Sequence, residues 1–137
     1  YSVEIPELDI FTQGEDHDDC VEMAIDSIET LLEDEGEVDI EFLSFDANDS
    51  NTFYLTSDNP GPLYSRFLYI LRSTYDLTQR EVADRLGDQS HNSYAQYEQG
   101  KHIPSVVKFQ ELVNAITDGE QVVTLGLAKV NKKKNVA

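Results

Sequence analysis

Carboxylates are the side chains of this sequence best able to take part in chemistry, because Asp and Glu supply 27 of its 137 residues. A metal-dependent nuclease would need three or four of them to converge on paired magnesium ions. Here they are spread along exposed helix and loop positions. The clearest series is Glu22, Asp26, Glu29 and Glu33. Such spacing is typical of a solvated helix face, so we predict a protein that is not an enzyme and holds no metal and no cofactor.

The charges are divided unevenly along the chain. Residues 1–60 hold 19 Asp and Glu and no Lys or Arg, and the first basic residue is Arg66. Residues 61–137 hold the other 8 acids and all 10 bases, so the two parts carry -19 and +2 of the total charge of -17. This asymmetry indicates two parts with two kinds of partner. The alternative is that the acidic part is simply soluble.

Length and cysteine content limit the class of protein further. A chain of 137 residues fits one ordinary domain or two small ones, and small domains gain from mutual support or oligomerisation. A single cysteine, Cys20, cannot form an internal disulfide, and neither a signal peptide nor a membrane-spanning apolar run is present. We expect a soluble, cytoplasmic protein. Because Tyr1 already lies in an alternating apolar pattern, we also expect that a preceding strand is missing from this chain.

The first 58 residues combine short strands with one helix. Strands are predicted at residues 1–5 and 10–12, after which Asp16 is a good N-cap and Gly36 is placed to end the helix. Two more strands are predicted on either side of the polar turn at 46–51, over 39–45 and 52–56. The predicted order is strand, strand, helix, strand, strand. The buried helix face is predicted to consist of Val21, Ala24, Ile25, Ile28, Leu31 and Leu32.

A linker is predicted between this part and the rest of the chain. The sequence Asn-Pro-Gly-Pro at residues 59–62 cannot sustain regular structure, and it coincides with the charge boundary. We therefore predict domains over 1–58 and 63–118, joined by the linker 59–62 and followed by a tail over 119–137. In the tail, residues 121–127 have the β-branched, apolar character of a strand that would pair across a dimer or within its own subunit. The lysines at 132–134 make the end of the tail basic.

The domain over 63–118 is predicted to be all-helical, with four short helices. The second helix lies between a capping box, formed by Thr78 with Glu81, and Gly87. Ser90 is expected to cap the third helix, and Pro104 to open the fourth at its first turn. The side chains expected to face the core are Leu63, Phe67, Ile70, Leu71, Val82, Ala83, Leu86, Tyr94, Tyr97, Phe109, Leu112, Val113 and Ile116.

The segment from Leu77 to Pro104 resembles the helix-turn-helix of the lambda-repressor and Cro class. It contains Leu-Thr-Gln-Arg-Glu-Val-Ala-Asp-Arg-Leu-Gly at 77–87 and Tyr-Glu-Gln-Gly-Lys at 97–101. In that class a small residue such as Ala83 lets two helices approach, and Gly87 makes the turn. The turn at 87–90 is one residue longer than is usual, which leaves the register of the third helix open by about one position.

The resemblance implies contacts with operator double-stranded DNA. The third helix would enter the major groove, where short polar side chains contact base edges, and the second helix would begin against a phosphate. The predicted DNA-contacting residues are Gln79, assigned to backbone phosphate, with Ser90, His91, Asn92, Ser93, Gln96 and Lys101. The alternative for Asn92 and Gln96 is that they are ordinary exposed polar residues.

The helical domain carries little charge with which to hold DNA. Residues 61–118 contain six bases and seven acids. Because DNA affinity usually rests on neutralising phosphates, a single subunit is expected to bind weakly. We therefore predict a homodimer that binds half-sites one or more helical turns apart. Whether dimers pair further into tetramers stays open.

The first part resembles the HicB antitoxin family. The resemblance lies in Tyr-Ser-Val-Glu-Ile-Pro-Glu-Leu at 1–8, in Thr-Gln-Gly-Glu-Asp at 12–16 and in the amphipathic helix that follows. The order of elements agrees, as does the fusion to a helix-turn-helix and a final strand. The resemblance implies an α+β protein, in which a truncated RNase H-like α/β domain precedes the all-α helix-turn-helix domain and a C-terminal strand. In that family the first domain begins with a strand before the one at Tyr1.

The same resemblance implies a partner, a small basic mRNA-cleaving toxin of the HicA type. A surface without cations can mimic RNA phosphates and cover the active site of a basic toxin. The toxin-binding residues predicted at the strand-to-helix corner are Asp9, Phe11, Thr12, Glu15 and Asp16. In this hypothesis the protein neutralises the toxin and represses its own operon. The alternative is a stand-alone repressor whose acidic part senses a ligand or mediates assembly.

Overall fold

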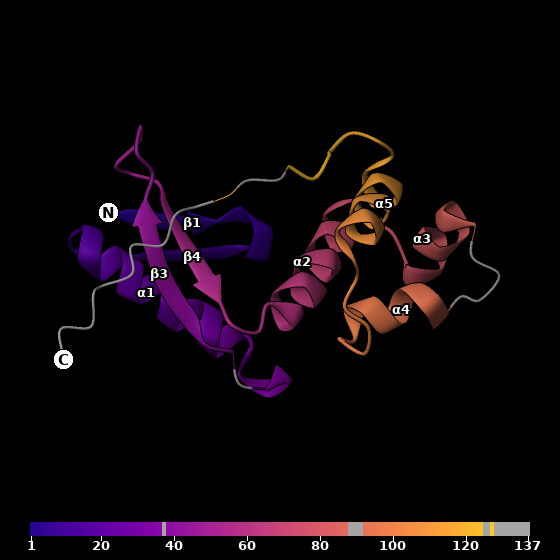
Figure 1. The fold of residues 1–137 in the computed structure, drawn as a ribbon, viewed down its shortest axis with the longest axis horizontal. Helices are drawn as coiled ribbons and strands as arrows, with labels where there is room; N and C mark the ends of the chain where they lie inside the picture. Colours follow the sequence, from indigo (N-terminus) through magenta and orange to yellow (C-terminus); the bar gives the residue numbers. More distant parts are fainter. Residues whose placement is uncertain (37, 88–91, 125–126, 128–137) are drawn as a thin grey trace.

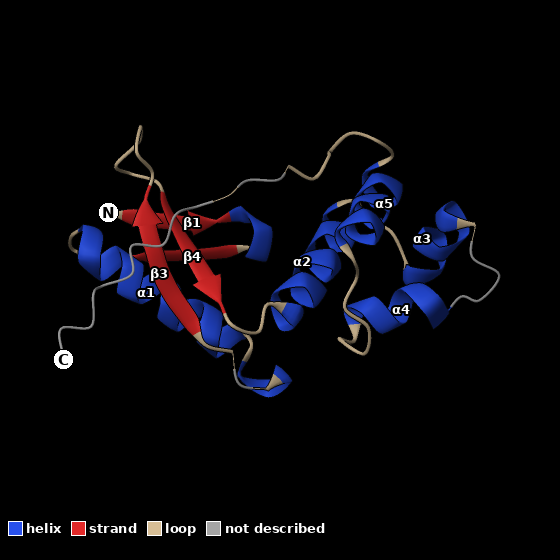
Figure 2. Cartoon of the chain, viewed as in Figure 1, coloured by secondary structure: helices blue, strands red, loops and turns tan. Residues whose placement is uncertain are grey.

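The computed structural model describes residues 1–36, 38–87, 92–124 and 127, and it has a mixed α/β architecture. The first half contains β1 (Ser2–Ile5), the 3-10 turn η1 (Pro6–Leu8), β2 (Ile10–Gln13), α1 (His17–Leu31), η2 (Glu33–Glu35), β3 (Ile40–Phe45) and β4 (Phe53–Ser57). The second half contains α2 (Gly61–Thr74), α3 (Gln79–Leu86), α4 (Asn92–Glu98) and α5 (Val106–Thr117). The strands and α1 lie at one end of the molecule, α3 and α4 lie at the other, and α2 lies between them (Figures 1 and 2). The predicted order of strand, strand, helix, strand, strand is confirmed.

The four strands form two separate antiparallel hairpins. β1 pairs with β2, with Val3 opposite Thr12, and β3 pairs with β4 around an irregularity between Phe42 and Ser44. No strand pairing joins the two hairpins among the described residues. The mixed α/β character that was predicted is present as two small antiparallel sheets, and the RNase H-like fold of the first half stays a prediction.

The beginning of α1 is fixed by its capping residues. The amide of Asp19 donates to Oδ1 of Asp16 at 2.8 Å, which confirms Asp16 as the N-cap, and the amide of Glu15 donates to Oδ2 of Asp19 at 2.7 Å. A Cβ atom at Gly14 would lie 2.5 Å from the backbone nitrogen of Cys20, so only glycine fits this close approach.

The end of α1 differs from the prediction. The helix stops at Leu31, and the chain tightens into η2 before it reaches Gly36. Gly36, with a φ of 107°, therefore ends the 3-10 turn and not the helix. On the predicted buried face Val21, Ala24, Ile28 and Leu32 are buried, whereas Ile25 and Leu31 are only partly buried.

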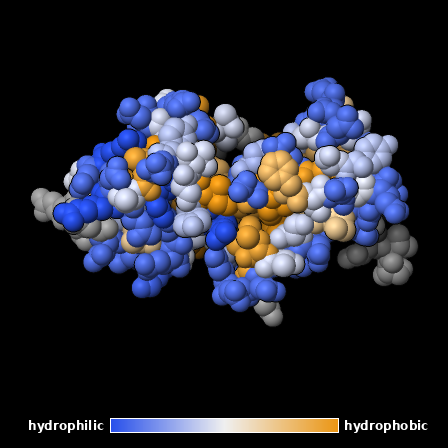
Figure 3. All heavy atoms as spheres, turned by 180° about the vertical axis from the view of Figure 1, so that it is seen from behind, coloured by the Kyte–Doolittle hydropathy of each residue, from blue (hydrophilic) through white to orange (hydrophobic). Residues whose placement is uncertain are grey.

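Helix α2 contributes to both hydrophobic cores. Leu63 and Ile70 pack against the first-half core of Leu8, Ile10, Ile28, Leu32 and Ile40. Leu68 and Leu71 are buried instead among the helices of the second half, with Phe67 packed beside them. The prediction that Leu63, Phe67, Ile70 and Leu71 all face one core is thus wrong, because the two sides of α2 face different cores. Apolar atoms gather where the two halves meet (Figure 3).

The predicted linker is also shorter in the structure. α2 begins at Gly61 with Pro62 in its first turn, so two of the four residues of the predicted linker 59–62 are helical. Proline is tolerated there because the first amides of a helix have no intrahelical acceptor.

The last helix begins two residues later than predicted, at Val106 and not at Pro104. The N-cap of α5 is Ser105, whose Oγ accepts from the amide of Lys108 at 3.1 Å, and Pro104 precedes it. A serine hydroxyl can satisfy a free helix amide, which the proline ring cannot, and this decides the start.

The strand predicted over residues 121–127 is not present at the described positions 121–124 and 127. The amide of Gln121 donates to Oγ1 of Thr117 at 3.1 Å, and Val123 packs against the helical core. A strand needs a partner edge, and none lies beside this segment in the described part of the subunit. Residues 125–126 and the lysines at 132–134 lie outside the described residues.

Candidate nucleic-acid interface

Helix α3 has the beginning and end predicted from its sequence. The amide of Glu81 donates to Oγ1 of Thr78 at 3.1 Å, and the amide of Thr78 donates to Oε1 of Glu81 at 3.2 Å, which is a complete capping box. The helix ends at Gly87, whose φ of 72° is in the left-handed region that favours glycine. Val82 and Ala83 are fully buried between the helices, as predicted. The two termini therefore fix where α3 presents its outer face.

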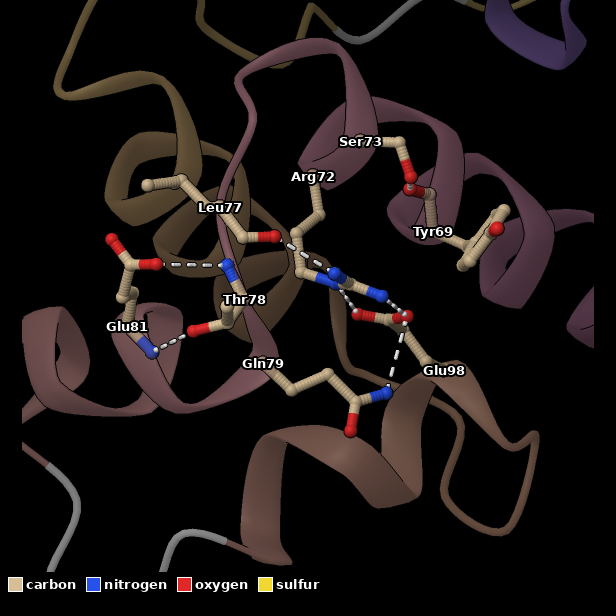
Figure 4. A network of polar contacts seen from close by, with 8 residues as sticks. All are labelled: Tyr69, Arg72, Ser73, Leu77, Thr78, Gln79, Glu81 and Glu98. Atoms are coloured by element: carbon tan, nitrogen blue, oxygen red, sulfur yellow. Dashed lines mark hydrogen bonds and ion pairs between the residues drawn. The ribbon is translucent and has the colours of Figure 1, made fainter.

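A buried ion pair fixes α4 against α2 (Figure 4). Arg72 of α2 donates through Nε to Oε2 of Glu98 at 2.6 Å and through a terminal nitrogen to Oε1 at 2.9 Å. Its other terminal nitrogen donates to the carbonyl of Leu77, at 2.8 Å, in the turn before α3. The side chains are 14% and 4% exposed, and the Glu98 carboxylate raises the pKa of Arg72. One guanidinium thus joins three segments of the domain. The sequence pattern assigns Glu98 only to the end of the helix and does not indicate this role.

The predicted phosphate ligand Gln79 points back toward this ion pair. Its Nε2 donates to Oε1 of Glu98 at 3.4 Å, and the residue is only partly exposed at the first position of α3. The side-chain amide is therefore oriented by Glu98 before any DNA is present. Phosphate binding by Gln79 stays a prediction.

The outer face of α4 carries three of the predicted DNA-contacting residues. Asn92 and Gln96 are four residues apart and so share one face of the helix, with Ser93 beside them. Asn92 is exposed, and Ser93 and Gln96 are partly exposed. Tyr94 on the opposite side is fully buried, so the prediction that it belongs to the core is confirmed. This arrangement leaves the amide side chains directed away from the core.

The other predicted base-contacting or phosphate-contacting residues in this region are Ser90, His91 and Lys101. Ser90, with its predicted capping role, and His91 lie outside the described residues, as does most of the turn at 87–90. Lys101 is exposed just beyond the end of α4. Asn92, Ser93 and Gln96 are therefore the predicted set that the structure brings together.

Most basic side chains of the helical domain are engaged within the protein. Besides Arg72, Arg85 donates to the carbonyls of Ala115 and Ile116 at 3.0 and 3.1 Å, and Lys108 lies 3.6 Å from Glu111. Arg80 and Lys101 are exposed and make no side-chain hydrogen bond or ion pair with any described residue. Arg80 is thus a candidate phosphate ligand that the sequence reasoning missed. Its position beside Gln79, in the first turn of α3, was the available signal.

Replacing Arg80 with glutamine is expected to weaken DNA binding about equally for all sequences. The guanidinium would neutralise a phosphate without contacting a base, so the salt slope should fall in magnitude by about 0.9 for each phosphate that is no longer neutralised. Titrating DNA at several salt concentrations measures this slope. Lys108→Gln is the matched control, because Lys108 is already paired with Glu111, and it should leave the slope unchanged. An unaltered slope in Arg80→Gln would exclude Arg80 from the interface.

Tyr94 gives the domain a weakness at high pH. Burial raises the pKa of Tyr94 well above its ordinary value of 10.0, and the nearby Glu98 carboxylate raises it further. The hydroxyl itself has no partner in hydrogen-bonding geometry among the described residues, so the effect of Glu98 is electrostatic. The folded state therefore favours the neutral phenol more strongly than the unfolded chain does.

The stability contributed by neutral Tyr94 should be complete below pH 10 and decline as the pH rises above about 10, where the unfolded chain ionises first. Tyr94→Phe is expected to remove this decline while changing the stability at pH 7 by no more than about 1 kcal/mol, since the hydroxyl makes no hydrogen bond. Thermal unfolding between pH 8 and 11 measures both effects. Tyr1→Phe is the control, because Tyr1 is 74% exposed. Its stability should decline above pH 10 as that of the parent protein does. An alkaline decline retained in Tyr94→Phe would contradict the assignment.

The residues predicted to bind a toxin lie along β2 and the corner before α1. Asp9, Glu15 and Asp16 are exposed, Thr12 is partly exposed, and Phe11 is 72% exposed. The carboxylate of Asp16 also caps α1. The five residues thus lie on one continuous segment of the sequence, and toxin binding by them stays a prediction. Among the described residues, no cluster of three or more His, Cys, Asp and Glu side chains could hold a metal ion. No helix in the described ranges is both long and apolar enough to cross a membrane.

Comparison with known proteins identifies the helical part. Residues 68–116 match the family model described as helix-turn-helix. No curated protein matches the chain, and no solved structure matches it. The match covers α3 and α4 together with the second half of α2 and most of α5, and it includes both residues of the Arg72–Glu98 pair. Residues 68–116 are therefore a helix-turn-helix domain of the lambda-repressor and Cro type, and DNA binding in transcription regulation is the function that this domain supports.

Proposed function

We propose that this chain is an antitoxin that represses its own operon, with a DNA-binding half and a half that neutralises a basic toxin. The observation that carries the proposal is the division of charge: 19 acids and no bases stand in residues 1–60, directly joined to the helix-turn-helix domain. A helix-turn-helix alone explains DNA binding. It does not explain a companion half with no cation, which would be repelled by DNA and attracted to a basic protein.

The proposed toxin is a small basic mRNA-cleaving protein of the HicA type, to which the resemblance of residues 1–16 points. Carboxylates on the exposed surface would take the place of RNA phosphates and speed the encounter. The predicted contacts remain Asp9, Phe11, Thr12, Glu15 and Asp16. Phe11 would supply the apolar contact at the centre of the acidic rim, because it is largely exposed.

The decisive experiment is to express the chain with the protein encoded by the adjacent reading frame and to purify the complex. A short basic partner that co-purifies, and whose RNA cleavage is blocked by this chain at low salt, would support the proposal. Cleavage that continues unchanged would reject it. Ligand-dependent DNA binding with no protein partner would favour the alternative, a stand-alone repressor that senses a small ligand.

We also propose that the chain binds DNA as a homodimer. Among the described residues of the helical domain, few cations remain available for phosphates, so two subunits on a palindrome would supply more affinity. An apolar surface on the helical domain supports pairing: Ile103, Val106, Val107 and Val122 are 65%, 56%, 69% and 70% exposed. Footprinting that detects a single unpaired half-site would reject the dimer. Truncation after Asp118 tests whether the tail contributes, since an unchanged dimer would exclude pairing through it.

We further propose that the acidic half acts by binding and not by catalysis, because its carboxylates are dispersed over exposed positions. RNA cleavage by the purified chain with magnesium, abolished by substitution of one carboxylate, would overturn this.

A further inference from the structure

A stripe of two arginines and a tyrosine lies on one face of α2. Arg66, Tyr69 and Arg72 are three residues apart, a spacing that places helix side chains next to one another. The guanidinium carbon of Arg66 lies 5.0 Å from the centre of the Tyr69 ring, and that of Arg72 lies 5.5 Å from it. Tyr69 is 44% exposed, so one accessible aromatic ring attracts two cations.

Only one of these two arginines has a counter-charge in the described part of the chain. Both oxygens of Glu98 accept from Arg72. Arg66 makes no ion pair and no hydrogen bond with any described residue, and its Nε is buried without a partner. Its two terminal nitrogens, unlike Nε, are accessible to solvent. Arg66 is therefore a guanidinium that is held by an aromatic ring and whose terminal donors are available to an anion.

One end of the stripe lies beside the start of α3. Arg72 donates to the carbonyl of Leu77, in the turn before α3, and the Glu98 carboxylate that it binds also accepts from Gln79 (Figure 4). Tyr69 contacts the same guanidinium from the preceding turn of α2. The ring is thus connected through two side chains to Gln79, the residue that is predicted to bind a DNA phosphate.

The other end of the stripe lies beside the turn that follows α4. A Cβ atom at Gly100 would lie 3.5 Å from Oγ of Ser65, so this turn packs against α2. Ser65 directly precedes Arg66, and Gly100 directly precedes Lys101, which is exposed and predicted to contact DNA. The stripe therefore runs between two segments that are predicted to lie at the DNA backbone.

The chemistry of a guanidinium selects the anion. Its donors form a planar fork that fits two oxygens of one phosphate, and the group stays charged at every pH at which the protein is folded. Duplex DNA presents a continuous series of phosphates on either side of the groove that a helix-turn-helix enters. A phosphate of the DNA backbone thus matches both the donor set of Arg66 and its place in the domain.

We propose that Arg66 binds a backbone phosphate of duplex DNA, at a site on α2 that lies outside α3 and α4. Its terminal nitrogens donate to the phosphate oxygens, and Tyr69 is a positioning residue that holds the guanidinium in place. The contact lengthens the DNA that one subunit covers and adds no discrimination between bases. The proposal rests on DNA binding by the helix-turn-helix domain and does not depend on a toxin partner.

The test uses the full chain and a duplex that the chain itself selects from random sequences. Copies of the duplex carry an uncharged methylphosphonate in place of one phosphate at a time. For the parent chain, one such replacement is expected to lower affinity about tenfold because it removes the phosphate bound by Arg66, which is the effect of a hydrogen bond between charged groups. Arg66→Gln is expected to bind the unmodified duplex about tenfold more weakly and to lose its sensitivity at that position alone.

A second variant separates phosphate binding from an effect on folding. Arg66→Met keeps an apolar stem against Tyr69 and removes the buried Nε that has no partner, so the fold should not lose stability. It is expected to show the same loss of sensitivity at one position. Lys108→Gln is the matched control, because Lys108 is paired with Glu111, and it should bind every duplex as the parent does. Sensitivity retained at all positions in the Arg66 variants would overturn the proposal.

The positioning role of Tyr69 is tested in two backgrounds. Tyr69→Leu removes the ring and is expected to weaken DNA binding about two- to fivefold, which corresponds to one exposed cation–π contact. Tyr69→Phe keeps the ring and should bind as the parent does. In the Arg66→Met background, Tyr69→Leu should have no further effect. A further loss in that background would mean that Tyr69 contacts DNA by itself and does not act through Arg66.

The remaining outcomes separate this site from the functions on which it rests. If Arg66→Met bound the duplex as the parent does but bound a single-stranded RNA less tightly, RNA would be the ligand and the proposal would be wrong. If the parent chain selected no duplex, DNA binding by the domain and this proposal would fail together. Tight DNA binding with an unchanged methylphosphonate pattern in the variants would reject the Arg66 site alone. Toxin inhibition is measured separately and bears on neither result.

Discussion

Replacing Glu98 with glutamine is expected to destabilise the helix-turn-helix domain by about 3–5 kcal/mol, because it leaves the buried guanidinium of Arg72 without a counter-charge. Both oxygens of Glu98 accept from Arg72, at 2.6 and 2.9 Å, and the Glu98 side chain is only 4% exposed. Water cannot replace the missing charge at such a site. The substitution would also release Gln79, whose amide donates to the same carboxylate. Urea unfolding followed by circular dichroism measures the change in the free energy of unfolding.

Two comparisons make this prediction specific. Glu111→Gln removes the exposed partner of Lys108 and should change stability by less than about 1 kcal/mol. The double variant Arg72→Met with Glu98→Leu should be more stable than Glu98→Gln, since neither charge then remains buried. A destabilisation of less than about 1 kcal/mol in Glu98→Gln would mean that the ion pair does not hold α4 in place.

Replacing Gln96 with alanine is expected to weaken specific operator binding at least about 30-fold, with little change in binding to unrelated DNA. A glutamine that makes a bidentate interaction with a base edge contributes about 1–3 kcal/mol, and a dimer would make two such interactions. Gln96 is suited to this role because it lies on the outer face of α4, opposite the buried Tyr94. Its side chain is partly exposed, so truncation should leave the fold intact.

The measurement is a titration of the chain with its operator and with a scrambled duplex at one salt concentration. Gln99→Ala is the matched control, because Gln99 is an exposed glutamine one residue beyond the end of α4. It should bind both duplexes as the parent does. Equal weakening on operator and scrambled DNA in Gln96→Ala would show that Gln96 contacts the backbone and does not discriminate bases.

Local structure was largely predictable from the sequence, because short-range rules determine it. The capping box of Thr78 and Glu81, the N-cap Asp16 and the left-handed Gly87 each depend on residues within about one helical turn. The buried positions Val82, Ala83, Tyr94 and Leu112 follow from the helical period. All of them except Asp16 lie within the residues that match the helix-turn-helix family model.

Features that depend on distant neighbours were not predictable. Helix α2 carries apolar residues on two sides, and which of them face the first-half core depends on where Leu8 and Ile40 lie. The segment at 121–124 has the composition of a strand but lacks a partner edge in the described subunit. Arg72 and Glu98 are 26 residues apart, and neither residue type alone indicates burial.

The carboxylates of this chain also have some properties that the sequence determines and others that depend on the fold. By itself the sequence determined that residues 1–60 carry no cation and that the chain contains a helix-turn-helix, because charge and helical period are properties of the residues in order. Only the tertiary structure decided that Glu98, one of the acids outside that half, is buried as the counter-charge of Arg72. The physical reason is that burial, ion pairing and strand pairing are made between segments far apart in the chain, and only the packed fold fixes which segments meet.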